Sequence, residues 1–175
     1  MFLFVILSKN QNMNNRIFNY IKRGVFIILS IYVICCVLLM YFQEKLLFHP
    51  EEIPKSEKYT YDSDFEEKYY TVEKGVELNT LLFSADTVSE NRKLVFFIHG
   101  NGENLKTLGG VASSFTDKGY DCFLYDYRGY GKSDGTIDSE ARLFADAQIL
   151  YAQMKQLYAE EDIVIVGYSI GTGIA

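Results

Sequence analysis

An unbroken apolar run covers residues 25–42, with Ser30 as its one polar position. A helix of this length reaches about 27 Å, close to the ~30 Å hydrocarbon core of a bilayer. The run is apolar on every face, unlike a helix that packs on a soluble core. It ends in the bulky residues Met40–Phe42 rather than in the small residues of a signal-peptide cleavage site. We therefore predict a retained transmembrane helix over 25–42.

Further along the chain the pattern is that of β-strands. Short runs of branched and aromatic apolar residues at 93–98 and 163–166 are typical of strands buried on both faces of a parallel sheet. The segments 66–72 and 76–84 flank Lys74-Gly75, which predicts a β-hairpin. Together these segments predict a sheet that contains both antiparallel and parallel strands.

Two segments between the strands have the 3.6-residue period of helices, 103–118 and 139–158. Gly119 is expected to end the first helix, and Asp138 or Ser139 to cap the second. The predicted buried faces are Leu105, Leu108, Val111, Ala112 and Phe115 in the first, and Leu143, Ala147, Leu150, Met154 and Leu157 in the second. Strands that alternate with helices predict an α/β fold with right-handed βαβ crossovers.

The motif with the clearest chemistry is G-x-S-x-G at Gly167–Gly171. In serine hydrolases this motif forms a sharp turn between strand and helix that exposes a nucleophilic serine. Here the predicted strand 163–166 precedes Ser169 and a run of small residues follows it, so the local context fits. The alternative, a glycine-rich turn without chemistry, explains less of the chain because two further motifs precede this one.

Those two motifs follow predicted strands. His99–Asn104 reads H-G-N-G-E-N, and the second motif reads D-Y-R-G-Y-G-K-S-D-G over residues 126–135. His99 precedes the serine, whereas the catalytic histidine of such a fold follows it, so His99 is expected to shape the loop through backbone hydrogen bonds. The other histidine, His49, is expected to be a packing or interface residue. Asp126 is likewise expected to pair or cap within its loop.

These three motifs, from about residue 69 to the end of the chain, resemble those of the α/β-hydrolase superfamily. The apolar helix and the L-L-F-H-P segment after it resemble a membrane-anchored subgroup related to serine aminopeptidases, monoacylglycerol lipases and acyl-protein thioesterases. The resemblance implies that Ser169 is the nucleophile and that the backbone amides of Asn101 and Ile170 form the oxyanion hole. It also implies a fold made of a mostly parallel sheet with flanking helices.

The resemblance divides the chain into a cytoplasmic segment (1–24), a transmembrane helix (25–42), a linker (43–65) and the N-terminal half of a hydrolase domain (66–175). In the superfamily the triad acid and histidine come after the nucleophile. We therefore expect a C-terminally truncated α/β-hydrolase fold that is inactive by itself. The alternative is a non-catalytic membrane-anchored fragment, or a split-gene half that needs a partner chain.

Charge and composition bear on partners and location. Arg16, Lys22 and Arg23 precede the apolar run, which predicts a cytoplasmic N-terminus and an extracytoplasmic hydrolase domain. All 23 acidic residues fall after residue 43, so nucleic acid is not expected as a partner. The expected partners are the bilayer, through 25–42, and a small or lipid-like acyl substrate; ester, thioester and amide all stay open. No cofactor or metal is expected, because neither phosphate-binding nor metal-ligand spacing is seen.

Overall fold

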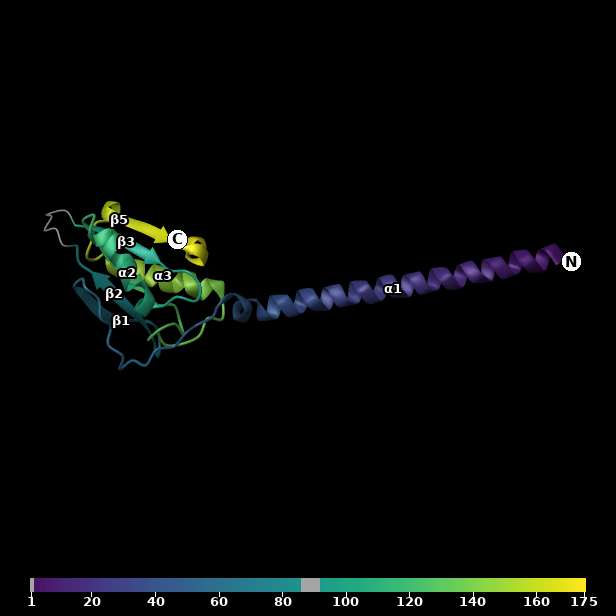
Figure 1. The fold of residues 1–175 in the computed structure, drawn as a ribbon, viewed down its shortest axis with the longest axis horizontal. Coiled ribbons are helices and arrows are strands. Elements are labelled where there is room, and N and C mark those ends of the chain that lie inside the picture. The colour runs from purple at the N-terminus through teal and green to yellow at the C-terminus, as the bar shows by residue number, and fades with distance from the viewer. Residues whose placement is uncertain (1, 86–91) are drawn as a thin grey trace. The chain divides into compact units, whose positions relative to one another are not determined.

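The computed structural model describes residues 2–85 and 92–175, with side chains from residue 16 onward. The chain forms two compact units, Met1–Gln43 and Glu44–Ala175. Most of the first unit is helix α1 (Phe2–Leu47), whose last turn belongs to the second unit. Figure 1 labels the three α-helices and most of the strands.

Helix α1 contains the predicted transmembrane segment. Its part Arg16–Leu47 is long and apolar enough to cross a membrane, and it is the one such helix in the described part of the chain. Ser30, the polar position in the apolar run, donates its hydroxyl to the carbonyl of Phe26 at 2.8 Å. This bond satisfies the hydroxyl within the helix, as a side chain in an apolar surrounding requires.

The second unit is built on a five-stranded sheet with the order β1-β2-β4-β3-β5. Its strands are β1 (Phe65–Glu73), β2 (Val76–Phe83), β3 (Lys93–Ile98), β4 (Tyr120–Tyr125) and β5 (Ile163–Gly167). The pairs β1–β2 and β2–β4 are antiparallel, whereas β4–β3 and β3–β5 are parallel. The hairpin predicted around Lys74-Gly75 is confirmed, and Gly75 has the positive φ of 80° that such a tight turn needs.

Helices cover both faces of the sheet. The helical elements are α2 (Leu105–Thr116), α3 (Glu140–Met154) and the short 3₁₀ segments η1 (Glu160–Asp162) and η2 (Ser169–Gly173). Alternate residues of β3 enter two separate hydrophobic clusters, Phe96 with α3 on one face and Phe97 with α2 on the other. The prediction that β3 is buried on both faces is therefore confirmed.

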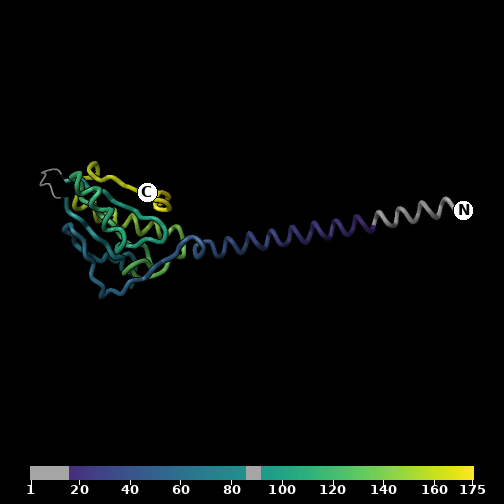
Figure 2. Tube along the Cα trace, in the orientation of Figure 1, coloured from purple at the N-terminus to yellow at the C-terminus, as the bar shows by residue number. Residues whose placement is uncertain are grey.

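Strand β5 differs, because it lies at the edge of the described sheet. Its Val164 and Ile165 remain 45% and 43% exposed. Figure 2 follows the chain to this edge, where the last residues run beside β3.

The predicted helix ends are partly wrong. The second helix ends at Met154, four residues earlier than predicted, so Leu157 is 60% exposed instead of buried. The chain turns there because Tyr158 reaches back to the sheet and donates its hydroxyl to Asp121 at 2.6 Å. The end of α2 was predicted closely, since Gly119 follows it with a φ of 83°.

Almost all of the segment predicted as a linker, residues 43–65, belongs to the second unit and packs against the rest of it. Tyr59 is buried, and its hydroxyl donates to Asn79 of β2 at 2.9 Å. Tyr61 packs against Phe83 and donates its hydroxyl to the carbonyl of Leu105. Aromatic rings supply the burial here that charge and proline content had obscured in the sequence.

Candidate active site

Ser169 stands at the turn between β5 and η2, in a backbone conformation that few residues other than glycine adopt. Its φ is 53°, and among the described residues it is the one non-glycine residue with a positive φ. Such a conformation costs on the order of 1–3 kcal/mol and is concentrated at functional sites. The side chain is exposed, so the turn presents the hydroxyl to the surroundings.

The two glycines of the motif allow the turn to be this tight. A methyl group at Gly167 would lie 2.6 Å from the carbonyl oxygen of Gly171. A methyl group at Gly171 would lie 2.6 Å from the carbonyl oxygen of His99 and would also meet that of Ile98. Backbone thus packs on backbone within the turn at Gly167, and between the turn and the end of β3 at Gly171.

The loop that follows β3 lies directly beside Ser169. The amide of Tyr168 donates to the carbonyl of Ile98 at 2.9 Å, which joins the two strand ends. A methyl group at Gly100 would touch Ser169 Cβ at 3.2 Å and Glu103 Oε2 at 3.3 Å. The structure therefore brings together the serine and the loop predicted to stabilise the oxyanion.

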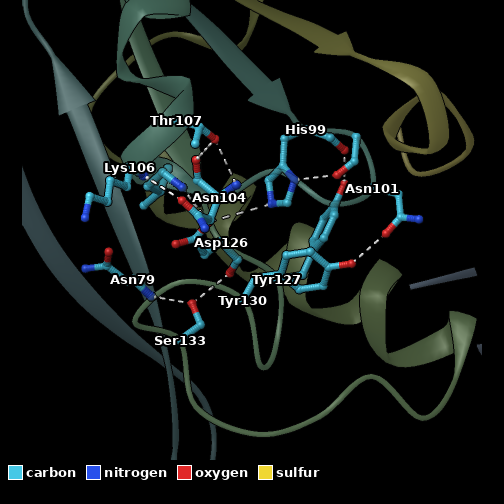
Figure 3. Close-up of polar contacts among 12 residues, drawn as sticks. Asn79, His99, Asn101, Asn104, Lys106, Thr107, Asp126, Tyr127, Tyr130 and Ser133 are labelled. Carbon is cyan, nitrogen blue, oxygen red and sulfur yellow. Dashed lines mark hydrogen bonds and ion pairs between the residues drawn. The ribbon is translucent and has the colours of Figure 1, made fainter. Parts of the chain in front are cut away.

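His99 holds this loop through a hydrogen bond to its backbone, as predicted. Its Nδ1 hydrogen-bonds the carbonyl of Gly100 at 2.7 Å, which makes Nδ1–H the donor (Figure 3). The side chain is 1% exposed, and burial lowers the pKa of the imidazole to about 4. Because a trans peptide is planar, fixing the Gly100 carbonyl also fixes the direction of the Asn101 N–H. His99 is thus neutral at pH 7 and orients the next amide.

Asp126 lies next to His99 and holds the start of helix α2. Its Oδ1 accepts the amide hydrogen of Leu105 at 2.8 Å and lies 3.9 Å from His99 Nε2. Burial raises the pKa of this carboxyl to about 8. At pH 7 both side chains are therefore mainly neutral, and their contact is not an ion pair. Asp126 was expected to pair or cap within its own loop; its side chain instead caps the start of α2, which follows the other loop.

The side chain of Asn101 hydrogen-bonds residues outside the loop that follows β3. Its Oδ1 accepts the hydroxyl hydrogen of Tyr130 at 2.8 Å and the amide hydrogen of His49 at 3.0 Å. Its Nδ2 donates to the carbonyl of Leu47. These contacts were not foreseen, because nothing in the local pattern around residue 101 points to a partner fifty positions away.

A buried ion pair fixes the loop after β4. Arg128 binds Asp146 of α3 through two hydrogen bonds of 2.6 and 2.8 Å, and Glu73 of β1 through a third at 2.8 Å. Planar, two-point binding of this kind gives strong geometric control. Asp146 lies on the apolar face of α3, between Leu143 and Ala147. A charged residue on that face is the feature of the sequence that could have indicated a buried ion pair.

Comparison with known proteins identifies the superfamily. Residues 89–175 match the family model described as serine aminopeptidase, S33. The chain is 37% identical over 87 residues to the lysophosphatidylserine lipase ABHD12 of Danio rerio, covering 47% of this chain and 22% of that protein. The second unit has the fold of an esterase from Pyrococcus furiosus, with a TM-score of 0.57, 21% identity, and coverage of 74% of this chain and 49% of that one. The chain belongs to the α/β-hydrolase superfamily.

A further relative extends over the N-terminal part of this α/β-hydrolase chain. Protein bem46 of Schizosaccharomyces pombe is 28% identical over 173 residues, which cover 94% of this chain and 57% of that protein. This α/β-hydrolase chain spans about half the length of the esterase and of protein bem46, and a smaller share of the lipase. The predicted fold class is thus confirmed, with strands and helices in the order expected before and around the nucleophile.

Proposed function

We propose that this chain carries the nucleophile and the oxyanion hole of a membrane-anchored serine hydrolase. The observation that carries the proposal is Ser169, exposed on a turn with a φ of 53° and in contact with the loop at Gly100. A strained serine backed by two strand ends is the arrangement that G-x-S-x-G hydrolases use. Superfamily membership supports the same assignment.

In the proposed reaction, the hydroxyl oxygen of Ser169 attacks the acyl carbon of an ester, thioester or amide. A histidine takes the hydroxyl proton and passes it to the leaving alcohol, thiol or amine, which leaves an acyl-serine. Water then attacks the acyl carbon while the histidine takes its proton; the bond to the serine oxygen breaks, the carboxylic acid leaves, and the histidine returns the proton to that oxygen. The backbone amides of Asn101 and Ile170 hold the negative charge on the carbonyl oxygen in both steps. Loss of one such donor typically costs about 100- to 1,000-fold in rate.

Neither histidine of the chain is positioned as the base. His99 is buried and its Nδ1 is bound to Gly100, while His49 lies against Asn101. Within the described residues, no hydrogen bond joins either imidazole to Ser169. Neither histidine within residues 1–175 therefore serves as the base in the proposed mechanism, and we expect the polypeptide of residues 1–175 to be inactive by itself.

A fluorophosphonate probe tests the nucleophile directly in the native membrane fraction. We expect covalent labelling on the peptide that contains Ser169, and at least a thousandfold loss in S169A. The matched control is S113A, because Ser113 is a partly exposed serine whose hydroxyl donates to the carbonyl of Gly110 within α2. Labelling that persists in S169A, or that disappears in S113A, would contradict the proposal.

A lipid-like acyl substrate is the preferred substrate class. A transmembrane helix within residues 25–42 would hold the catalytic unit close to a bilayer, and the Danio rerio relative is named a lipase. Lysophospholipid and soluble p-nitrophenyl esters of equal chain length separate this class from small esters. A preference for the soluble ester in membranes would argue against a lipid substrate.

The proposed topology is single-pass, with the N-terminus in the cytoplasm and the catalytic unit outside it. Arg16, Lys22 and Arg23 precede the apolar run and favour this orientation. Protease added to sealed vesicles of known orientation should digest residues 44–175 only from the extracytoplasmic side. Digestion from the cytoplasmic side would reverse the assignment.

A second candidate is a fragment completed by a partner chain. The open edge at β5 favours it, together with a cavity of about 300 Å³ that Phe96, Phe144 and Ile165 help to line. Such a partner would add a strand to β5 and cover this apolar surface. Stable co-purification of a second polypeptide with labelled Ser169 would support this candidate, and labelling without one would exclude it.

A further inference from the structure

The side chain of Asn101 links the loop beside Ser169 to the segment that follows the apolar helix. Oδ1 accepts the amide hydrogen of His49 at 3.0 Å, and Nδ2 donates to the carbonyl of Leu47. The Tyr130 hydroxyl completes the group, since it donates to Oδ1 at 2.8 Å (Figure 3) and also lies 3.1 Å from the His49 amide nitrogen. All of these residues belong to the second unit. We call this group the Asn101 latch.

The segment on the other side of the latch is itself firmly seated. The amide of Ile53 donates to the carbonyl of Gly131 at 2.7 Å, and the amide of Gly131 donates to the carbonyl of Glu51 at 2.9 Å. Phe48 packs against the hydrophobic cluster on the α3 face. The Asn101 latch therefore joins the loop to a segment that is itself held by hydrogen bonds and by packing.

The latch acts on the peptide that matters for the proposed chemistry. His99 holds the carbonyl of Gly100 at 2.7 Å, which is one side of the peptide between Gly100 and Asn101. The Asn101 side chain holds the other side of the same residue through Leu47 and His49. Two supports restrain rotation of this peptide, and its N–H is the proposed oxyanion donor. Oxyanion stabilisation depends on such preorganised donors.

Chain connectivity adds a link to the membrane. Leu47 follows Phe42, the last residue of the apolar run, by only five positions. Five residues span at most ~18 Å. A helix held in a bilayer therefore constrains the segment that the latch binds, and through it the loop beside Ser169.

We propose that Asn101 is a positioning residue: its side chain fastens the segment Leu47–His49 to the oxyanion loop and thereby sets the reactivity of Ser169. This inference rests on the proposed function of Ser169. It separates two roles of one residue, because the backbone amide binds the oxyanion and the side chain holds that amide in place.

Two variants break the latch without removing the backbone donor. N101A deletes the side-chain amide, and Y130F deletes the hydroxyl that donates to it while leaving Asn101 unchanged. K106A is the matched control. Lys106 also joins the segment 43–65 to helix α2, through an ion pair with Glu57 at 2.8 Å. This pair is exposed and lies outside the Asn101 latch.

Amide hydrogen exchange measures the fastening itself, independently of any activity. In the full chain in membranes, N101A and Y130F should each exchange at least about fivefold faster in peptides covering 44–53 and 99–104, since each variant loses two or more hydrogen bonds and one alone gives about this effect. K106A should leave both peptides unchanged. Unchanged exchange in N101A and Y130F would overturn the proposal.

The rate of fluorophosphonate labelling, measured in the native membrane fraction and not on the isolated polypeptide of residues 1–175, reports the effect on reactivity. We expect the maximal labelling rate to fall about tenfold in N101A and Y130F, with the probe concentration at half-saturation unchanged, because the loop acts in the transition state. A change in half-saturation alone, or a loss that follows thermal stability alone, would overturn the positioning role. If the wild-type protein is not labelled at all, the proposed function fails, whereas the exchange experiment still decides whether the latch exists.

Discussion

At the scale of single residues, the site depends on where backbone meets backbone. Ser169 is strained, and its neighbours Gly167, Gly171 and Gly100 have almost no room for a side chain. The strain is maintained because the ends of β3 and β5 are joined through the hydrogen bond from Tyr168 to Ile98. Steric exclusion at these three glycines thus holds the turn at Ser169 in place.

A substitution at Gly171 tests whether the lack of room for a side chain holds this turn in place. In G171A the new methyl group would meet the carbonyls of Ile98 and His99, so we expect a loss of about 1–3 kcal/mol of stability and a lower rate of Ser169 labelling. G173A is the control, because a methyl group at Gly173 has no neighbour within 4 Å. Chemical denaturation and labelling rates would compare the two, and equal behaviour would contradict the steric explanation.

Asp126 gives the protein a pH dependence that can be measured. Its pKa of about 8 lies above the unfolded value near 3.9, so the native state keeps a proton that the unfolded state releases. Its contribution to stability is therefore lost as pH rises toward 8. His99 acts in the opposite direction below pH 6.5, because its pKa is lowered to about 4. The two contributions largely cancel between pH 4 and 6.5.

The test compares D126N with the wild type by denaturant unfolding. Asparagine keeps the oxygen that accepts from Leu105 but cannot titrate. Between pH 6.5 and 8 the wild type should lose about 1.5 kcal/mol of stability relative to D126N. A difference between the two proteins that stays constant over this range would show that the Asp126 carboxyl is already ionised in the native state.

At the scale of elements, helix α2 packs against the segment 43–65, which was predicted as a linker. Gly109 faces the ring of Tyr61, whereas the neighbouring Gly110 is exposed and a methyl group there has no neighbour within 4 Å. We expect G109A to destabilise the protein by about 1–3 kcal/mol, because it displaces Tyr61. G110A should instead stabilise it by about 1 kcal/mol, since alanine favours a helix interior. Thermal unfolding of the two variants measures the contrast, and a gain in G109A would show that Tyr61 does not pack there.

At the scale of the whole molecule, we expect the β5 edge of the sheet to affect solubility. Strand β5 exposes Val164 on an unpaired edge in the described part of the chain, and such an edge favours strand pairing between copies. For the isolated polypeptide of residues 1–175 we expect aggregation, which V164K should reduce several-fold. L157K is the control, because Leu157 is more exposed but lies outside the sheet. Light scattering during refolding measures this effect, and equal improvement in both variants would rule out an edge-specific cause.

Local patterns alone predicted most of the elements. The strands over 93–98 and 163–166, the hairpin at Lys74-Gly75 and the apolar helix all follow from short-range periodicity, which backbone geometry imposes on any chain. The motif around Ser169 likewise predicted a sharp turn. The assignment of Asn101 and Ile170 as oxyanion donors stays a prediction.

Only the tertiary structure decided the contacts between distant positions. The burial of Tyr59, the early end of α3 at Met154 and the binding of Leu47 by Asn101 all join segments far apart in the chain. Periodicity carries no information about such pairs, because it records which face of an element is apolar and not what packs against that face. The sharp turn at Ser169 was therefore predictable from five consecutive residues, whereas the contacts that support the neighbouring loop after β3 exist only in the folded chain.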